Sequence, residues 1–122
     1  MKPKIYLAGP DVFYKDTIAQ ATFLKKKCET YGFEGIFPLD NQLDLSVMTK
    51  HQGAQAIYQS NIEMIDRCDG VLVNMQPFRG PGMDGGSAFE MGYATAKGKP
   101  VVGYLDKTEL YFERVRKYYQ HL

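Results

Sequence analysis

Two carboxylates at a loop-to-helix transition are the residues of this sequence best suited to chemistry. Asp84 and Glu90 lie in the stretch GPGMDGGSAFEMGYA, residues 80–94. Glycines let a backbone approach a ligand closely, because they take positive φ without steric cost. The free N–H groups and the dipole at a helix start favour negative charge, so we expect these carboxylates to stay ionised. The stretch therefore predicts a small-molecule site with a charged centre.

A structural interpretation of the same stretch competes with the chemical one. Ser87 and Glu90 have the spacing of a capping box, in which the two side chains bind free N–H groups at the start of a helix. Taken alone, the stretch supports both interpretations equally.

Paired carboxylates are suited to reaction at the anomeric carbon of a sugar. One carboxylate attacks as the nucleophile and forms a covalent glycosyl-enzyme, while the other delivers a proton to the leaving group. A flexible loop that carries Asp84 can fold back over Glu90, and the hydroxyl of Tyr6 can hold the orientation of the nucleophile.

Other chemistries find little support in the composition. Fifteen basic and fourteen acidic residues give a net charge of +1, which offers no basic surface for nucleic acid or membrane. There is no phosphate-binding GxxxxGK[ST] or GxGxxG motif. His51 and His121 are expected at the surface, and Cys28 and Cys68 lack the spacing of metal ligands or a disulfide framework. We expect no metal site, and a reduced, cytoplasmic compartment.

The 122 residues are expected to form a single domain, 1–122, in which strands alternate with helices. Apolar runs predict strands at residues 4–8, 35–37, 71–75 and 100–104. Helical spacing predicts helices at residues 16–31, 55–67, 87–97 and 109–122. The alternation predicts a flavodoxin-like three-layer α/β/α domain with a parallel sheet of four to five strands. Such sheets bind ligands beyond the carboxyl ends of their strands, where residues 6–11, 38–42 and 74–86 then meet at one rim.

Four motifs at this rim closely resemble those of the nucleoside 2-deoxyribosyltransferases. They are Tyr6-Leu7-Ala8-Gly9-Pro10, Pro38-Leu39-Asp40-Asn41-Gln42, Asn61, and the D-x5-E-M-G-Y-A run from Asp84 to Ala94. The resemblance extends over residues 4–106. One such motif occurs by chance, whereas four in the family's order form a specific signal.

The resemblance implies a transfer of the 2-deoxyribosyl group between nucleobases without a cofactor. Glu90 would be the nucleophile, Tyr6 would position it by a hydrogen bond, and Asp84 with Asn61 would contact the base and handle its proton. The further substrate-binding residues that it implies are Gly9, Phe13, Asp40, Gln42 and Gly86. Phe13 would stack on the base, Gln42 would contact it, and Asp40 would brace the surrounding loop. The substrates would be 2′-deoxynucleosides and free nucleobases, as in nucleotide salvage.

Individually, these residues also have structural interpretations. Tyr6 and Phe13 would suit a core, Asp40 a turn, and Asn61 a helix surface. Two other functions remain open: hydrolysis of the N-glycosidic bond of a nucleoside or a 2′-deoxynucleoside 5′-monophosphate, and ligand binding by a regulatory domain without turnover.

The C-terminal region departs from the family pattern. Relatives carry an Asn-Leu-Met motif after the fourth strand, whose asparagine reaches into a neighbouring subunit's site. This sequence has no such motif and passes from Asp106 directly to Lys107-Thr108-Glu109. The family resemblance still implies a homo-oligomer, a dimer or a hexamer, and leaves open whether residues are missing between Asp106 and Glu109.

Overall fold

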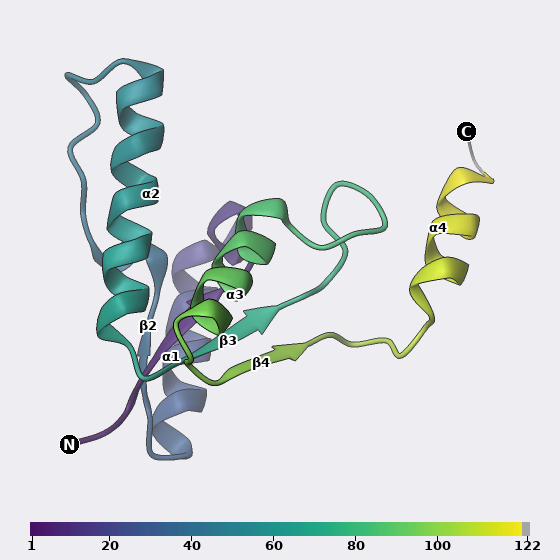
Figure 1. The fold of residues 1–122 in the computed structure, drawn as a ribbon, viewed down its shortest axis with the longest axis horizontal. Helices are drawn as coiled ribbons and strands as arrows, with labels where there is room; N and C mark the ends of the chain where they lie inside the picture. Colours follow the sequence, from purple (N-terminus) through teal and green to yellow (C-terminus); the bar gives the residue numbers. More distant parts are fainter. Residues whose placement is uncertain (121–122) are drawn as a thin grey trace.

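Four parallel strands form the sheet at the centre of the fold. The computed structural model describes residues 1–120. Its strands are β1 (Lys4–Ala8), β2 (Glu34–Ile36), β3 (Gly70–Asn74) and β4 (Val101–Tyr104), in the spatial order β2-β1-β3-β4 (Figure 1). Each lies within one residue of its predicted bounds. From β1 the chain runs first to one side, to β2, and then to the other, to β3, so the switch point lies between β1 and β3. The predicted flavodoxin-like fold class is confirmed.

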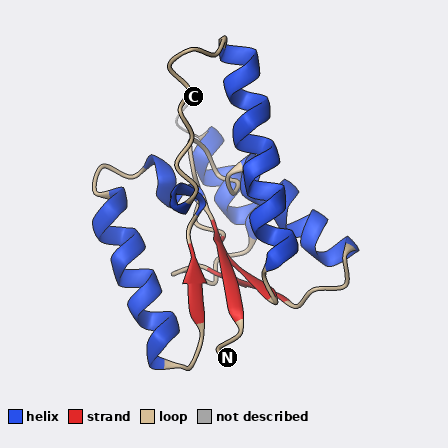
Figure 2. Cartoon of the chain, turned by 90° about the vertical axis from the view of Figure 1, so that its left-hand side faces the viewer, coloured by secondary structure: helices blue, strands red, loops and turns tan. Residues whose placement is uncertain are grey.

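Helices cover both faces of this sheet, as Figure 2 shows. α1 (Thr17–Thr30) packs on one face, and α2 (Lys50–Arg67) and α3 (Gly85–Ala96) pack on the other. The alternation of side chains along β1 explains the two cores, because successive residues of a strand point to opposite faces. Tyr6 and Ala8 lie against α2 and α3, whereas Leu7 lies against α1. The side chain of Tyr6 is therefore directed beneath α3.

The second helix starts five residues earlier than the predicted Gln55. α2 begins at Lys50 because Thr49 caps it. The Thr49 hydroxyl accepts a hydrogen bond from the Gln52 N–H at 3.1 Å, and the Gln52 side chain accepts one from the Thr49 N–H at 3.0 Å. This is a capping box, which the polar stretch before Gln55 contained as a readable Thr-x-x-Gln signal.

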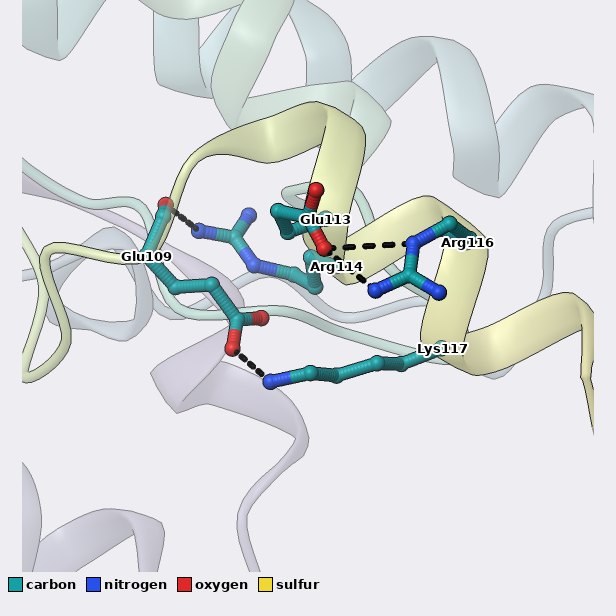
Figure 3. Close-up of polar contacts among 5 residues, drawn as sticks. All are labelled: Glu109, Glu113, Arg114, Arg116 and Lys117. Carbon is teal, nitrogen blue, oxygen red and sulfur yellow. Dashed lines mark hydrogen bonds and ion pairs between the residues drawn. The ribbon is translucent and has the colours of Figure 1, made fainter.

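The last helix, α4 (Tyr111–Tyr119), stands away from the sheet (Figure 1). Arg114 ties it to the loop after β3 by donating to the Pro81 carbonyl at 3.1 Å. Figure 3 shows two ion pairs of this region, Lys117 with Glu109 at 2.6 Å and Arg116 with Glu113 at 2.7 Å. Exposed pairs of this kind contribute little to stability. His121 lies outside the described residues.

Candidate active site

Glu90 lies at the centre of the candidate site, on the face of α3 that packs against β1. Its side chain is largely buried, and its Oε2 accepts a hydrogen bond from the Tyr6 hydroxyl at 2.7 Å. Tyr6 is fully buried in the middle of β1, so it reaches Glu90 from within the core rather than from the rim. The glutamate is thus positioned by α3, which carries it, and by β1, which carries its hydrogen-bond donor.

Burial raises the pKa of Glu90 to about 7, from an ordinary value of 4.5. The hydrogen bond from Tyr6 opposes this rise, the negative charge of Asp84 adds to it, and the Asn61 amide lowers the pKa again. Glu90 therefore exists in both protonation states near neutral pH. The expectation of a fully ionised carboxylate is wrong, because burial outweighs the effect of the helix start.

Tyr6 serves this glutamate as a permanent hydrogen-bond donor. Burial, followed by the charge of Glu90 and the hydrogen bond to it, raises the pKa of the Tyr6 hydroxyl far above its ordinary value. The phenol therefore stays protonated near neutral pH and can donate its proton to the Glu90 carboxylate.

Asp84 is the N-cap of α3. Its Oδ2 accepts hydrogen bonds from the Ser87 N–H at 3.0 Å and from the Ser87 hydroxyl at 2.7 Å. The predicted capping box of Ser87 and Glu90 is therefore wrong: α3 begins at Gly85, before Ser87, and Glu90 bonds to Tyr6 instead. Glu90 thus bonds to a residue distant in the sequence instead of to the N–H groups at the start of its own helix. Asp84 lies near enough to Glu90 for its charge to act on the glutamate.

Asn61 brings a third element to the site. It lies on α2, half-buried, with its amide beside the Glu90 carboxylate, whose pKa it lowers. The structure thus gathers four predicted site residues, Tyr6, Asn61, Asp84 and Glu90, from β1, α2 and the start of α3.

Phe13 forms an aromatic pair above the ends of the strands. It is exposed, and its ring stacks on that of Phe78, with centroids 5.4 Å apart and planes inclined by 17°. The Arg79 guanidinium lies over both rings, 5.2 Å from Phe13 and 4.6 Å from Phe78. Phe78 is not among the site residues predicted from the sequence, although it lies in the loop after β3.

Asp40 and Gln42 lie on the β2 side of the fold. The Asp40 carboxylate accepts from the Phe37 N–H at 2.9 Å and pairs with Lys25 at 2.6 Å, so it braces the turn after β2. Gln42 is exposed beside a surface hollow of about 460 Å³ that Asp40 also lines. Within residues 1–120, neither side chain is hydrogen-bonded to Glu90 or to its partner Tyr6.

The two candidate glycines differ in how strictly the backbone requires them. Gly9 has φ of +153°, and a Cβ there would lie 2.6 Å from the Cβ of Asn74 and would also clash with Asp11. Gly86 has an ordinary φ, and its Cβ would meet Asp84 at 3.5 Å, an ordinary contact. Of these two positions, the backbone therefore requires glycine only at position 9.

An apolar groove elsewhere on the described surface lies apart from this site. The groove, of about 620 Å³ on the α1 face, contains none of the candidate residues and has only Lys27 and Asp69 as charged lining side chains. Among residues 1–120, no cluster of three or more His, Cys, Asp or Glu side chains is arranged for a metal ion. No helix in that range is long and apolar enough to cross a membrane.

A buried glutamate at the switch point of a flavodoxin-like sheet, with a second carboxylate beside it, fits chemistry at a glycosidic bond. The comparison with protein families agrees: a model of the family "Nucleoside 2-deoxyribosyltransferase" matches residues 5–119. The chain belongs to this family.

Individual relatives extend this comparison. An uncharacterised protein of Schizosaccharomyces pombe is 38% identical over an alignment of 120 residues, which covers 95% of this chain and 56% of that protein. The solved structure of a 2-deoxyribosyltransferase from Leishmania mexicana has a TM-score of 0.71 and 34% identity, covering 84% of this chain and 63% of its own. A 2-deoxyribosyltransferase of Bacillus psychrosaccharolyticus, 21% identical with a TM-score of 0.69, shares the fold, over 94% of this chain and 81% of its own. This chain thus spans a little over half the length of the yeast protein.

Proposed function

We propose that this protein transfers a 2-deoxyribosyl group between nucleobases through a covalent intermediate on Glu90. The observation that carries the proposal is the buried hydrogen bond of 2.7 Å from the Tyr6 hydroxyl to Glu90 Oε2. It directs one carboxylate oxygen to β1 and leaves Oε1 to face the substrate. The 2-deoxyribosyltransferase from Leishmania mexicana, which is 34% identical to this chain, supports the same class of reaction.

In the first half-reaction, Glu90 Oε1 attacks C1′ of a 2′-deoxynucleoside. A bond forms between this oxygen and C1′ while the bond from C1′ to the base nitrogen breaks, and its electron pair leaves with the base. The departing base gains a proton by way of Asp84. The transition state resembles an oxocarbenium ion, which the carboxylate of Glu90 stabilises by its charge.

In the second half-reaction, a nitrogen of the acceptor base attacks C1′ of the glycosyl-enzyme. The bond from C1′ to Glu90 breaks, its electron pair returns to the carboxylate, and the acceptor base loses its proton to Asp84. Two inversions at C1′ leave the configuration of the sugar unchanged. Since Tyr6 donates to Glu90 throughout, it stabilises the carboxylate both as nucleophile and as leaving group.

Base exchange is the direct test of this function. The protein is incubated with one 2′-deoxynucleoside and a different free base, and the products are separated by chromatography. A new nucleoside that appears with wild type but not with Glu90→Ala supports transfer. Release of free sugar at the same rate with and without the acceptor base shows a hydrolase instead, and turnover of Glu90→Ala near the wild-type rate excludes Glu90 as the nucleophile.

A further inference from the structure

A second buried carboxylate, Asp11, lies below the rim and takes no part in the proposed chemistry. It lies three residues beyond the end of β1, and only 2% of its surface is exposed. Its carboxylate accepts hydrogen bonds from the Asn74 amide at 3.2 Å and from the Gln20 amide at 2.9 Å. In residues 1–120 it has no ion pair with a cationic side chain. A buried charge held only by amides is costly, so its partners must be well aligned.

Asn74 connects this carboxylate to the loop that leads to Asp84. It is the last residue of β3, and its amide also donates to the Tyr14 hydroxyl at 3.1 Å. Its Oδ1 accepts from the N–H of Gln76, at the start of the loop, at 3.0 Å. Asn74 thus holds the segment after β1 with its nitrogen and the segment after β3 with its oxygen.

The same two segments carry the aromatic pair. Phe13 lies two residues beyond Asp11, and Phe78 lies two residues beyond Gln76. The absence of a Cβ at Gly9 is what lets Asp11 and Asn74 approach one another. The bond between Asp11 and Asn74 therefore lies at the base of the two segments whose tips bring the rings together.

We propose that Asp11, acting through Asn74, is a positioning residue that sets the Phe13–Phe78 pair as the platform for the nucleobase. This inference rests on the proposed function and on the expectation, drawn from the family resemblance, that Phe13 stacks on the base. It predicts that loss of the Asp11–Asn74 bond weakens binding of the base while the chemistry at Glu90 continues.

The proposal can be tested by reversing donor and acceptor in the hydrogen bond between Asp11 and Asn74. In Asp11→Asn only one oxygen is left to accept from the Asn74 and Gln20 amides, and the new NH2 group takes the place of the other acceptor. The double variant Asp11→Asn/Asn74→Asp reverses the polarity: the amide at position 11 donates to the carboxylate at position 74. That carboxylate still accepts from the Gln76 N–H, and the Tyr14 hydroxyl and the Gln20 amide can rotate to fit.

Steady-state kinetics of base exchange are measured for these variants, with Asp16→Asn as the matched control. Asp16 is an exposed aspartate whose side chain makes no cap hydrogen bond. A hydrogen bond to a charged group is strong enough to change an equilibrium about tenfold. We expect Asp11→Asn to raise KM for the acceptor base about tenfold with kcat within about threefold of wild type, and the double variant to restore KM. Asp16→Asn should leave both constants unchanged.

A purely structural role would lower the stability of Asp11→Asn without changing KM of the folded protein. An unchanged KM in folded Asp11→Asn, or a double variant that regains stability but not KM, overturns the proposal. If Asp11→Asn does not fold, Gln20→Met takes its place, since it removes one donor to Asp11; we then expect KM to rise about threefold, and an unchanged KM overturns the proposal.

A measurement without substrate separates this proposal from the proposed function. The ring protons of Phe13 and Phe78 shift one another's NMR signals because the rings stack. We expect these ring-current shifts to be lost in the variant that breaks the Asp11 contacts and regained in the double variant, whether or not the protein exchanges bases. Shifts that persist in Asp11→Asn refute the positioning role even if base exchange is confirmed.

Discussion

Replacing Glu90 by glutamine should stabilise the protein more strongly as the pH rises. The glutamate has a pKa of about 7 in the folded protein and an ordinary value of 4.5 in the unfolded chain. The native state therefore holds a proton between these values that the unfolded state has lost. The glutamate destabilises the fold once both states are ionised, and the full difference of about 2.5 pKa units corresponds to about 3 kcal/mol.

The sign follows from proton binding. Because the folded pKa is raised, the contribution of protonated Glu90 to stability is complete below about pH 4.5 and is lost as the pH rises through about 7. Glutamine has no proton to lose, yet its side-chain oxygen still accepts from Tyr6. The free energy of unfolding of Glu90→Gln relative to wild type should thus increase by about 2.5 kcal/mol between pH 5 and pH 8.

Urea unfolding followed by circular dichroism measures this difference at the two pH values. Taking the variant relative to wild type removes the contribution of every other titrating group. Glu29→Gln, on the exposed surface of α1, is the control and should show no comparable trend. A relative stability of Glu90→Gln that does not change between pH 5 and pH 8 would refute the raised pKa and the burial on which it depends.

Four further changes test other parts of the structure. Tyr6→Phe removes a hydrogen bond that lowers the pKa of Glu90, so the acid limb of the pH profile of kcat/KM should move above pH 7; an unmoved limb would contradict the role of Tyr6. Asn61→Asp places another carboxylate beside Glu90 and should move the limb in the same direction, whereas Asn61→Gln should move it less. Thr49→Ala should lower the free energy of unfolding by about 1 kcal/mol in urea titrations, because α2 loses its cap; no loss would argue against this helix start. Gly9→Ala should cost at least about 1 kcal/mol in the same assay, since its φ is positive and its Cβ would clash, while Gly86→Ala should cost less.

Much of the fold could be predicted from local patterns. The alternation of short apolar runs with helical spacing located the four strands within one residue, and the parallel order follows from that alternation. The observed start of α2 precedes the predicted one because apolar spacing does not reveal the polar cap at Thr49. Apolar spacing indicates only the part of a helix that packs on the core, and the first turn of α2 lies outside that part.

The details of the site depended on contacts between distant residues. Glu90 has the local sequence of a capping box, yet it bonds to Tyr6, 84 residues earlier in the chain. Its pKa likewise depends on burial between β1, α2 and α3, which no local rule reports. Asp11 could not be singled out, because its partner Asn74 lies 63 residues away. Residue types indicated candidate residues, whereas the fold determines their hydrogen-bond partners and the direction of the pKa shift of Glu90.

The most direct test of Glu90 as a covalent nucleophile is the mass of the enzyme during turnover. The protein is mixed with a 2′-deoxynucleoside in the absence of acceptor base, quenched in acid, and digested with trypsin. We predict a mass increase of one 2-deoxyribosyl group on the peptide of residues 80–97, located by fragmentation on Glu90 rather than Asp84, and absent from Glu90→Gln. Base exchange by a protein that carries this group on Asp84, or on no residue at any time, would contradict the assignment.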